Sequence, residues 1–152
     1  MERRGVKTLI IDANISLSQA IYLPYSEQAA AFIEKSRRAG NAFLAPWLWA
    51  YEVVSGLRKA VVSGILTADG AMAALDQFEL FQIKMIEPSN QLNRLALEWA
   101  ERLGHSKAYD AQYVAAASQT GSEFWTADKR LANKSVQIGA TWVHWVGEIE
   151  AD

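Results

Sequence analysis

Short apolar runs alternate along the chain with longer segments that carry apolar side chains at helical spacing. The runs that predict strands are residues 8–11, 42–45, 84–86, 123–126 and 142–146. The segments that predict helices are residues 26–39, 47–62, 67–81, 89–103, 109–119 and a short one from 128. Ser26 and Thr67 are expected to cap their helices, Met72 to face inward, and Gly121 to end the segment 109–119. Strands that alternate with helices are typical of a parallel sheet covered on both faces. The sequence therefore predicts an α/β fold with a mainly parallel central sheet.

Length and composition predict one ordinary folded domain. The chain has 152 residues, of which 51% are hydrophobic and 21% charged, and we expect one domain over residues 1–152. The chain contains no cysteine, which excludes disulfides, a thiolate zinc site and a cysteine nucleophile. The net charge of −2 argues against a protein that coats nucleic acid, so contact with RNA would depend on local patches or on bound metal ions.

Two apolar segments have some features of a signal peptide or a membrane span, and both are too short. The basic start is followed by an apolar run over residues 6–11 that contains Lys7 and ends at Asp12, which is too short for a signal peptide. Residues 42–57 contain Pro46 and Glu52 and fall short of a membrane span. We therefore expect a cytoplasmic protein with no membrane partner.

Three acidic residues stand alone in largely apolar segments. Asp12 is the only charged residue between Lys7 and Glu27, and Asp110 is the only one between Lys107 and Glu123. Glu52 is the only one between Arg38 and Arg58. Three and four residues before and after Glu52, no Lys or Arg is present to pair with it across a helical turn. An unpaired ionised carboxylate in such surroundings is costly, so Glu52 needs a partner such as a cation.

Four acids are expected at one edge of the sheet. Asp12 follows the first strand and Asp128 follows a later one, and sites in parallel α/β sheets form at the carboxyl ends of the strands. Asp110 opens a helix, and Glu52 lies one to two turns into its helix. Four carboxylates gathered there would repel one another unless a metal ion bound them. Oxygen ligands without His or Cys favour Mg²⁺ or Mn²⁺.

Each acid also has an ordinary structural interpretation. Asp110 and Asp128 could be helix N-caps, and Asp12 could be a turn residue at the end of a strand. Glu52 could be paired with a distant arginine. A metal site is favoured because all four acids fall at the expected edge or in an apolar segment.

In order and spacing, the sequence resembles the PIN-domain ribonucleases of the VapC toxin type, over nearly the whole chain. The matching pieces are Leu9-Ile10-Ile11-Asp12-Ala13-Asn14, Glu52 with Leu57, Tyr109-Asp110-Ala111-Gln112-Tyr113-Val114-Ala115-Ala116-Ala117 and Trp125-Thr126-Ala127-Asp128. The resemblance implies a three-layer α/β/α fold with Asp12, Glu52, Asp110 and Asp128 as catalytic, metal-binding residues. It implies that Asn14 and Thr126 support these acids. Ser55 departs from the pattern, since many relatives have Asn there.

The resemblance also implies an activity and partners. The activity is an Mg²⁺- or Mn²⁺-dependent endoribonuclease in which metal-activated water hydrolyses RNA phosphodiester bonds and leaves a 5′-phosphate. The protein would be the toxin of a toxin–antitoxin pair, restrained by a cognate antitoxin protein. The apolar, tryptophan-rich composition suits such an interface and a homodimer, and it equally suits a core.

Other residues have weaker functional interpretations. Arg58, Lys59, Lys129 and Arg130 could steer the RNA backbone, or they could be ordinary solvated charges. Most of the six tryptophans are expected in the core or an interface, with Trp47 and Trp49 as candidates for base stacking. His105 and His144 have no spacing that predicts a metal site or a catalytic triad.

Two other functions remain as alternatives. The first is a catalytically inactive PIN-fold module that binds RNA or protein, although such a module would normally have lost some of the acids. The second is a phosphohydrolase of the haloacid dehalogenase kind, which would need an aspartate where Asn14 stands.

Overall fold

A five-stranded parallel sheet forms the centre of the protein, in a computed structural model that describes residues 5–151. The strands are β1 (Thr8–Ile11), β2 (Ala42–Pro46), β3 (Lys84–Ile86), β4 (Glu123–Thr126) and β5 (Val143–Trp145). Their order in the sheet is β3-β2-β1-β4-β5, and every neighbouring pair is parallel. The α/β class and the parallel sheet expected from the sequence are confirmed.

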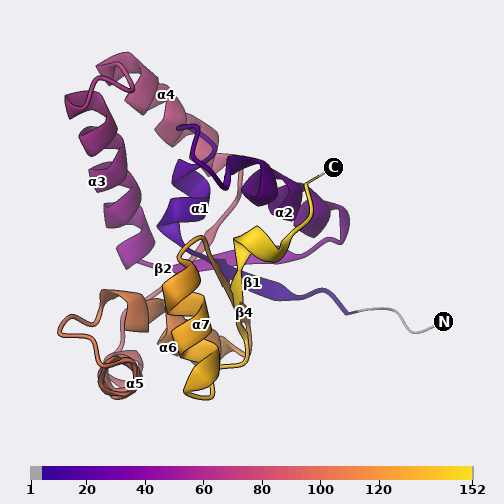
Figure 1. Ribbon diagram of the computed structural model, residues 1–152, viewed down its shortest axis with the longest axis vertical. Helices are drawn as coiled ribbons and strands as arrows, with labels where there is room; N and C mark the ends of the chain where they lie inside the picture. Colours follow the sequence, from indigo (N-terminus) through magenta and orange to yellow (C-terminus); the bar gives the residue numbers. More distant parts are fainter. Residues whose placement is uncertain (1–4, 152) are drawn as a thin grey trace.

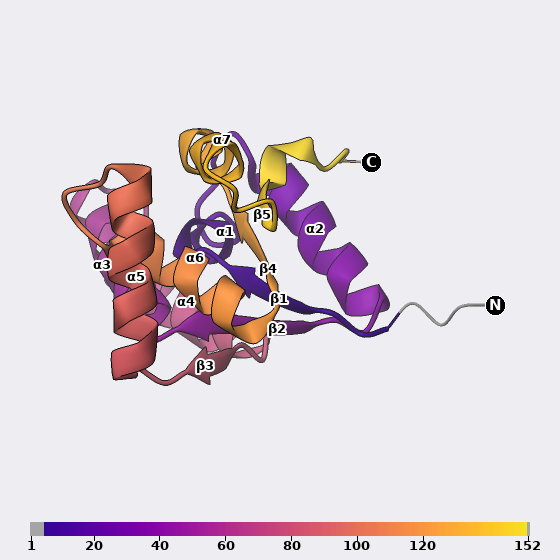
Figure 2. The same cartoon turned by 90° about the horizontal axis from the view of Figure 1, so that it is seen from below.

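Helices cover both faces of this sheet. They are α1 (Ala13–Leu17), α2 (Ser26–Arg38), α3 (Leu48–Val62), α4 (Ala68–Glu79), α5 (Asn90–Leu103), α6 (Tyr109–Thr120) and α7 (Lys129–Gln137), followed by a 3-10 turn, η1 (Val146–Glu148). Helix α2 lies on one side of the sheet, and α5 and α6 lie on the other (Figures 1 and 2). The result is a three-layer α/β/α arrangement.

Successive side chains of β1 point to opposite faces of the sheet and pack into two different parts of the core. Leu9 and Ile11 pack with Phe32 of α2, whereas Ile10 belongs to the cluster on the α6 side. Helix α6 is buried on nearly all sides, since Ala111 and residues 113–117 are all buried. Alanine side chains there let the helix backbone lie close to both the sheet and α5, which fixes the start of α6 at the sheet edge.

Several helix ends are those expected from the sequence. Thr67 and Ser89 cap α4 and α5 by accepting hydrogen bonds from the Gly70 and Leu92 amides. Gly121 ends α6 with a φ of 65°, in the left-handed region that favours glycine.

Some local expectations were wrong. Ser26 does not cap α2, because its hydroxyl accepts from the Leu23 amide and donates to the Ser18 carbonyl. Met72 does not face inward: 67% of it is exposed, and the buried residues of α4 are Ala74 and Phe78. Residues 142 and 146 lie outside β5, because the backbone turns into η1 directly after Trp145. The short helix α1 was not expected.

The direction in which successive strands are added to the sheet changes at β1. From β1 it moves outward through β2 to β3, and it then returns to the other side of β1 for β4 and β5. The carboxyl ends of β1 and β4 therefore flank the switch point at which α/β folds bind ligands. No helix in residues 5–151 is long and apolar enough to cross a membrane. One domain over residues 1–152 stays a prediction, and residues 1–4 and 152 lie outside the described residues.

Candidate acidic site at the carboxyl edge of the sheet

Asp12 lies directly after β1 and is almost completely buried, with 8% of the residue exposed. Its backbone amide donates to the Trp125 carbonyl of β4 at 3.0 Å, which holds it between the two strands. Burial raises the pKa of the Asp12 carboxyl to about 7, with the hydrogen bond from Thr126 opposing the rise and the charges of Glu52 and Asp110 adding to it. The structure thus keeps a carboxylate where its charged form is poorly solvated.

Thr126, the last residue of β4, connects the acids on its two sides. Its hydroxyl donates to Asp12 Oδ2 at 2.8 Å and accepts from the Asp128 amide at 3.0 Å. Asn14 Nδ2 lies 3.4 Å from the same hydroxyl, and Asn14 Oδ1 accepts from the Ala127 amide. This network fixes one oxygen of Asp12 and joins β1 to the loop after β4.

Glu52 lies on α3 and is held from across the site by a tyrosine. The hydroxyl of Tyr113, a fully buried residue of α6, donates to Glu52 Oε1 at 2.6 Å. Burial raises the pKa of Glu52, Asp110 raises it further, and the Tyr113 hydrogen bond opposes both. Burial and the charges of Asp12 and Glu52 raise the pKa of Tyr113 as well, so its hydroxyl stays a donor.

Asp110 is the second residue of α6 and does not cap the helix. Burial raises the pKa of its carboxyl, as does the charge of Asp128, while His105 acts in the opposite direction. His105 Nδ1 lies 3.8 Å from Asp110 Oδ2. The sequence assigned no chemistry to His105, because nothing in its spacing showed that the loop before α6 returns it to Asp110.

Asp128 is exposed and caps α7, where its Oδ1 accepts from the Leu131 amide at 3.0 Å. The cap interpretation is therefore correct for Asp128 and wrong for Asp110. The second carboxylate oxygen of Asp128 makes no hydrogen bond within the described part of the chain. It acts on Asp110 through its charge.

The four acids form one electrostatically coupled set. Asp12 interacts with Glu52 and Asp110, and Asp110 also interacts with Glu52 and Asp128. Oxygen donors with this much mutual repulsion suit Mg²⁺ or Mn²⁺. Within residues 5–151, however, no three His, Cys, Asp or Glu side chains are grouped closely enough to hold one ion. The chemical type of the donors, all of them carboxylates, nevertheless fits a divalent cation.

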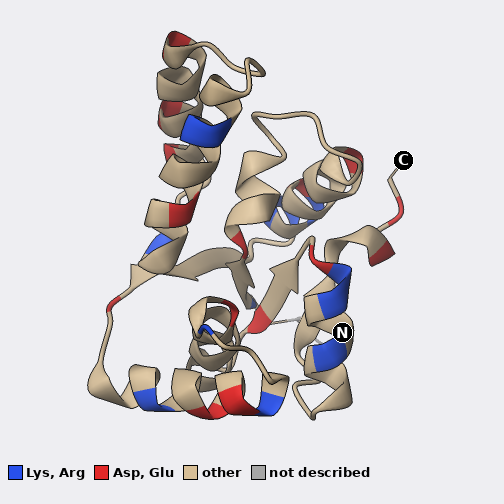
Figure 3. Ribbon diagram, turned by 60° about the vertical axis from the view of Figure 1, so that its left-hand side comes forward, with Lys and Arg blue, Asp and Glu red and all other residues tan. Residues whose placement is uncertain are grey.

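The remaining candidate residues fall into two groups. Trp49 is buried and donates from Nε1 to Ser16 Oγ at 3.1 Å, so its suggested role in base stacking is wrong. Trp47 is 44% exposed. Arg58, Lys59, Lys129 and Arg130 are exposed, and Figure 3 shows basic positions along α7. Lys129 lies over the Trp145 ring, 4.6 Å from its centroid.

Similarity to solved structures covers nearly the whole chain. A structure of PAE2754 from Pyrobaculum aerophilum has a TM-score of 0.66 and 24% identity, covering 94% of this chain and 85% of that one. A chain of the VapBC2 complex from Rickettsia felis, bound to a DNA fragment from its promoter, has a TM-score of 0.68 and 15% identity, covering 91% and 98%. The chain has a PIN-like fold. It resembles the VapC-type toxins in this respect.

A third structure with the PIN-like fold is part of a toxin–antitoxin complex from Klebsiella pneumoniae. It has a TM-score of 0.61 and 17% identity, and the match covers 90% of this chain and 95% of that one. No protein-family model matches the chain, and no curated protein matches its sequence. At these identities the property that the chains share is the PIN-like fold.

Asp12→Asn should stabilise the cation-free protein more at pH 8 than at pH 5. The native pKa of about 7 exceeds the ordinary value of 3.8, so the native state binds the proton more tightly than the unfolded chain. The Asp12 carboxyl therefore lowers the free energy of unfolding only a little at low pH, and it lowers it more as the pH rises toward 7. We expect the gain in unfolding free energy to be ~2 kcal/mol larger at pH 8, measured by urea denaturation with EDTA.

The exposed residue Asp76 of α4 offers a matched control, since Asp76→Asn should change stability by less than ~0.5 kcal/mol at either pH. An Asp12→Asn effect that is equal at the two pH values would contradict the buried-carboxylate account.

Tyr113→Phe should raise the pKa of Glu52, because the variant removes a hydrogen bond that favours the carboxylate form. Carboxyl carbon NMR during a pH titration measures this change. Tyr22→Phe, at an 81% exposed tyrosine, is the control and should leave Glu52 unchanged. An unaltered Glu52 titration in Tyr113→Phe would mean that the 2.6 Å contact does not hold the carboxylate in solution.

Proposed function

We propose that this protein is an Mg²⁺- or Mn²⁺-dependent endoribonuclease that acts as the toxin of a toxin–antitoxin pair. The observation that carries the proposal is the coupled set of raised carboxyl pKa values at the sheet edge. Groups tuned in this way cluster at functional sites. Asp12, Glu52, Asp110 and Asp128 would hold the cation, which supplies positive charge for the phosphate and lowers the pKa of water.

The protein's own side chains would do three things in such a reaction. Thr126 orients Asp12 through the 2.8 Å hydrogen bond, and Tyr113 orients Glu52 through the 2.6 Å one. Because its pKa is about 7, the Asp12 carboxyl could lose its proton near neutral pH and so would be able to hold the cation. Basic residues of α7, beginning at Lys129 directly after Asp128, would attract the RNA backbone.

The role as a toxin is supported by the fold. Two of the structures that share it are the VapBC2 complex and a toxin–antitoxin complex. We propose a cognate antitoxin protein as the partner of this chain, and a homodimer as its own assembly. Exposed apolar side chains on α3 and α4, such as Val54, Val62 and Met72, offer surface for such contacts.

A second candidate function is a PIN-fold module that binds RNA or protein without cleaving RNA. The spacing of the acids favours it, because no three acids in residues 5–151 lie close enough to share an ion. The capping bond of Asp128 to the Leu131 amide also occupies one potential ligand oxygen.

Purified protein should cleave single-stranded RNA in Mg²⁺ or Mn²⁺, and EDTA should abolish the cleavage. Asp12→Asn and Asp110→Asn should each lower kcat about 100-fold or more, because each removes a charge that holds the cation. Asp69→Asn, on the exposed first turn of α4, is the matched control and should keep full activity.

Cleavage that survives both substitutions undiminished would contradict the proposed nuclease. RNA binding by the unsubstituted protein without any cleavage in either metal would favour the inactive module.

A further inference from the structure

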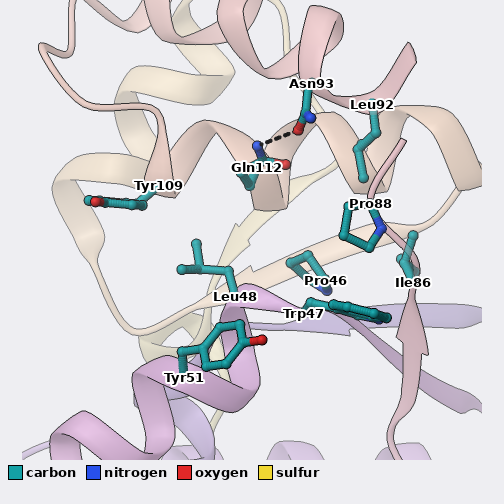
Figure 4. Close-up of a pocket in the computed structure, with 10 residues that line it drawn as sticks. All are labelled: Pro46, Trp47, Leu48, Tyr51, Ile86, Pro88, Leu92, Asn93, Tyr109 and Gln112. Atoms are coloured by element: carbon teal, nitrogen blue, oxygen red, sulfur yellow. Dashed lines mark hydrogen bonds between the residues drawn. The ribbon is translucent and has the colours of Figure 1, made fainter. Parts of the chain in front are cut away.

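A cavity of about 290 Å³ opens between α3, α5 and α6 (Figure 4). Pro46 and Ile86, the last residues of β2 and β3, line it. It therefore lies at the same edge of the sheet as Asp12 and Asp128, which follow β1 and β4.

Three aromatic side chains line the cavity and are largely exposed. The exposed fractions are 44% for Trp47, 67% for Tyr51 and 58% for Tyr109. Tyr51 precedes Glu52 on α3, and Tyr109 precedes Asp110 on α6. The elements that supply two of the acids thus also supply exposed rings, on which a flat ligand could stack.

Two amide side chains form another part of the wall. Gln112 Nε2 donates to Asn93 Oδ1 at 3.1 Å, and this hydrogen bond joins α6 to α5. Figure 4 shows the pair on the side of the cavity away from Trp47 and Tyr51. Gln112 Oε1 and Asn93 Nδ2 make no other hydrogen bond within residues 5–151, so the wall offers an acceptor and a donor side by side.

The cavity lining contains no Asp, Glu, Lys or Arg. An uncharged wall of aromatic rings, aliphatic side chains and two amides suits a neutral, flat group with a hydrogen-bonding edge and does not suit a phosphate. The volume of about 290 Å³ is large enough for a single flat ring system. The phosphates of such a ligand would lie toward the acids and the basic residues of α7.

We infer that this cavity binds one unpaired nucleobase of the RNA, next to the phosphate at the acidic site, an inference that rests on the proposed function. The base stacks on the exposed rings, and its edge pairs with the amides of Asn93 and Gln112. Single-stranded RNA is commonly recognised by stacking and by amide contacts to base edges. The cavity would select unpaired RNA, because a base inside a duplex cannot enter it.

The test measures binding of a fluorescein-labelled single-stranded RNA decamer of mixed sequence by fluorescence anisotropy. Asp12→Asn serves as the parent protein, in Mg²⁺, so that cleavage does not deplete the probe. Adding Tyr51→Leu or Tyr109→Leu should raise Kd about 5-fold or more, because each removes a stacking ring. Tyr51→Phe and Tyr109→Phe keep the ring and should keep the Kd of the parent.

Two controls separate base binding from other effects. Tyr22→Leu removes an exposed tyrosine outside the cavity and should leave Kd unchanged. A decamer of the same length with abasic sites should bind the parent and the leucine variants equally, since it offers only the backbone.

The inference is overturned if the leucine variants bind RNA as tightly as the parent, or if the parent does not bind RNA. A loss of self-association in these variants by sedimentation, with Kd unchanged, would assign the cavity to a contact with a second copy of the chain. The proposed nuclease fails separately: it is wrong if the unsubstituted protein does not cleave RNA, even where the tyrosines govern binding.

Discussion

The buried carboxyl of Asp12 is the constraint on which the rest of the site depends. It lies between two parallel strands, with its amide bonded to Trp125 and one oxygen bonded to Thr126. The fully buried Tyr113 lies close enough for the charge of Asp12 to raise its pKa. Ionising the Asp12 carboxyl in that position costs free energy unless a cation lies beside it. The charges of Glu52 and Asp110 increase this cost.

The topology explains why residues so far apart in the sequence meet there. Asp12 and Asp128 follow adjacent strands, β1 and β4, at their carboxyl ends. Helix α3 follows β2 and therefore begins at the same edge, carrying Glu52. Helix α6 runs back along the sheet toward the start of β4, so its first turn, with Asp110, also lies at this edge. The parallel arrangement thus assembles the acids and the aromatic cavity together.

The sequence predicted the strands well because each is a short apolar run with clear boundaries. β1 and β4 have the expected bounds. It did not predict α1, because five residues are too few to show a helical period. It could not identify Tyr113 as the partner of Glu52, because 61 residues separate them and a buried tyrosine resembles any core residue. His105 was missed for the same reason, since only the folded loop brings it to Asp110.

Whether the buried Asp12 carboxyl takes part in cation binding can be measured on the unsubstituted protein. Isothermal titration with Mn²⁺ at pH 7, in two buffers of different ionisation enthalpy, measures both affinity and proton release. We expect saturable binding with release of about half a proton per cation, because a carboxyl with a pKa of about 7 is half protonated at this pH and a bound cation would displace that proton. Asp12→Asn should remove the proton release and weaken binding. Titrations with no saturable heat, or with binding that is independent of Asp12, would contradict the account.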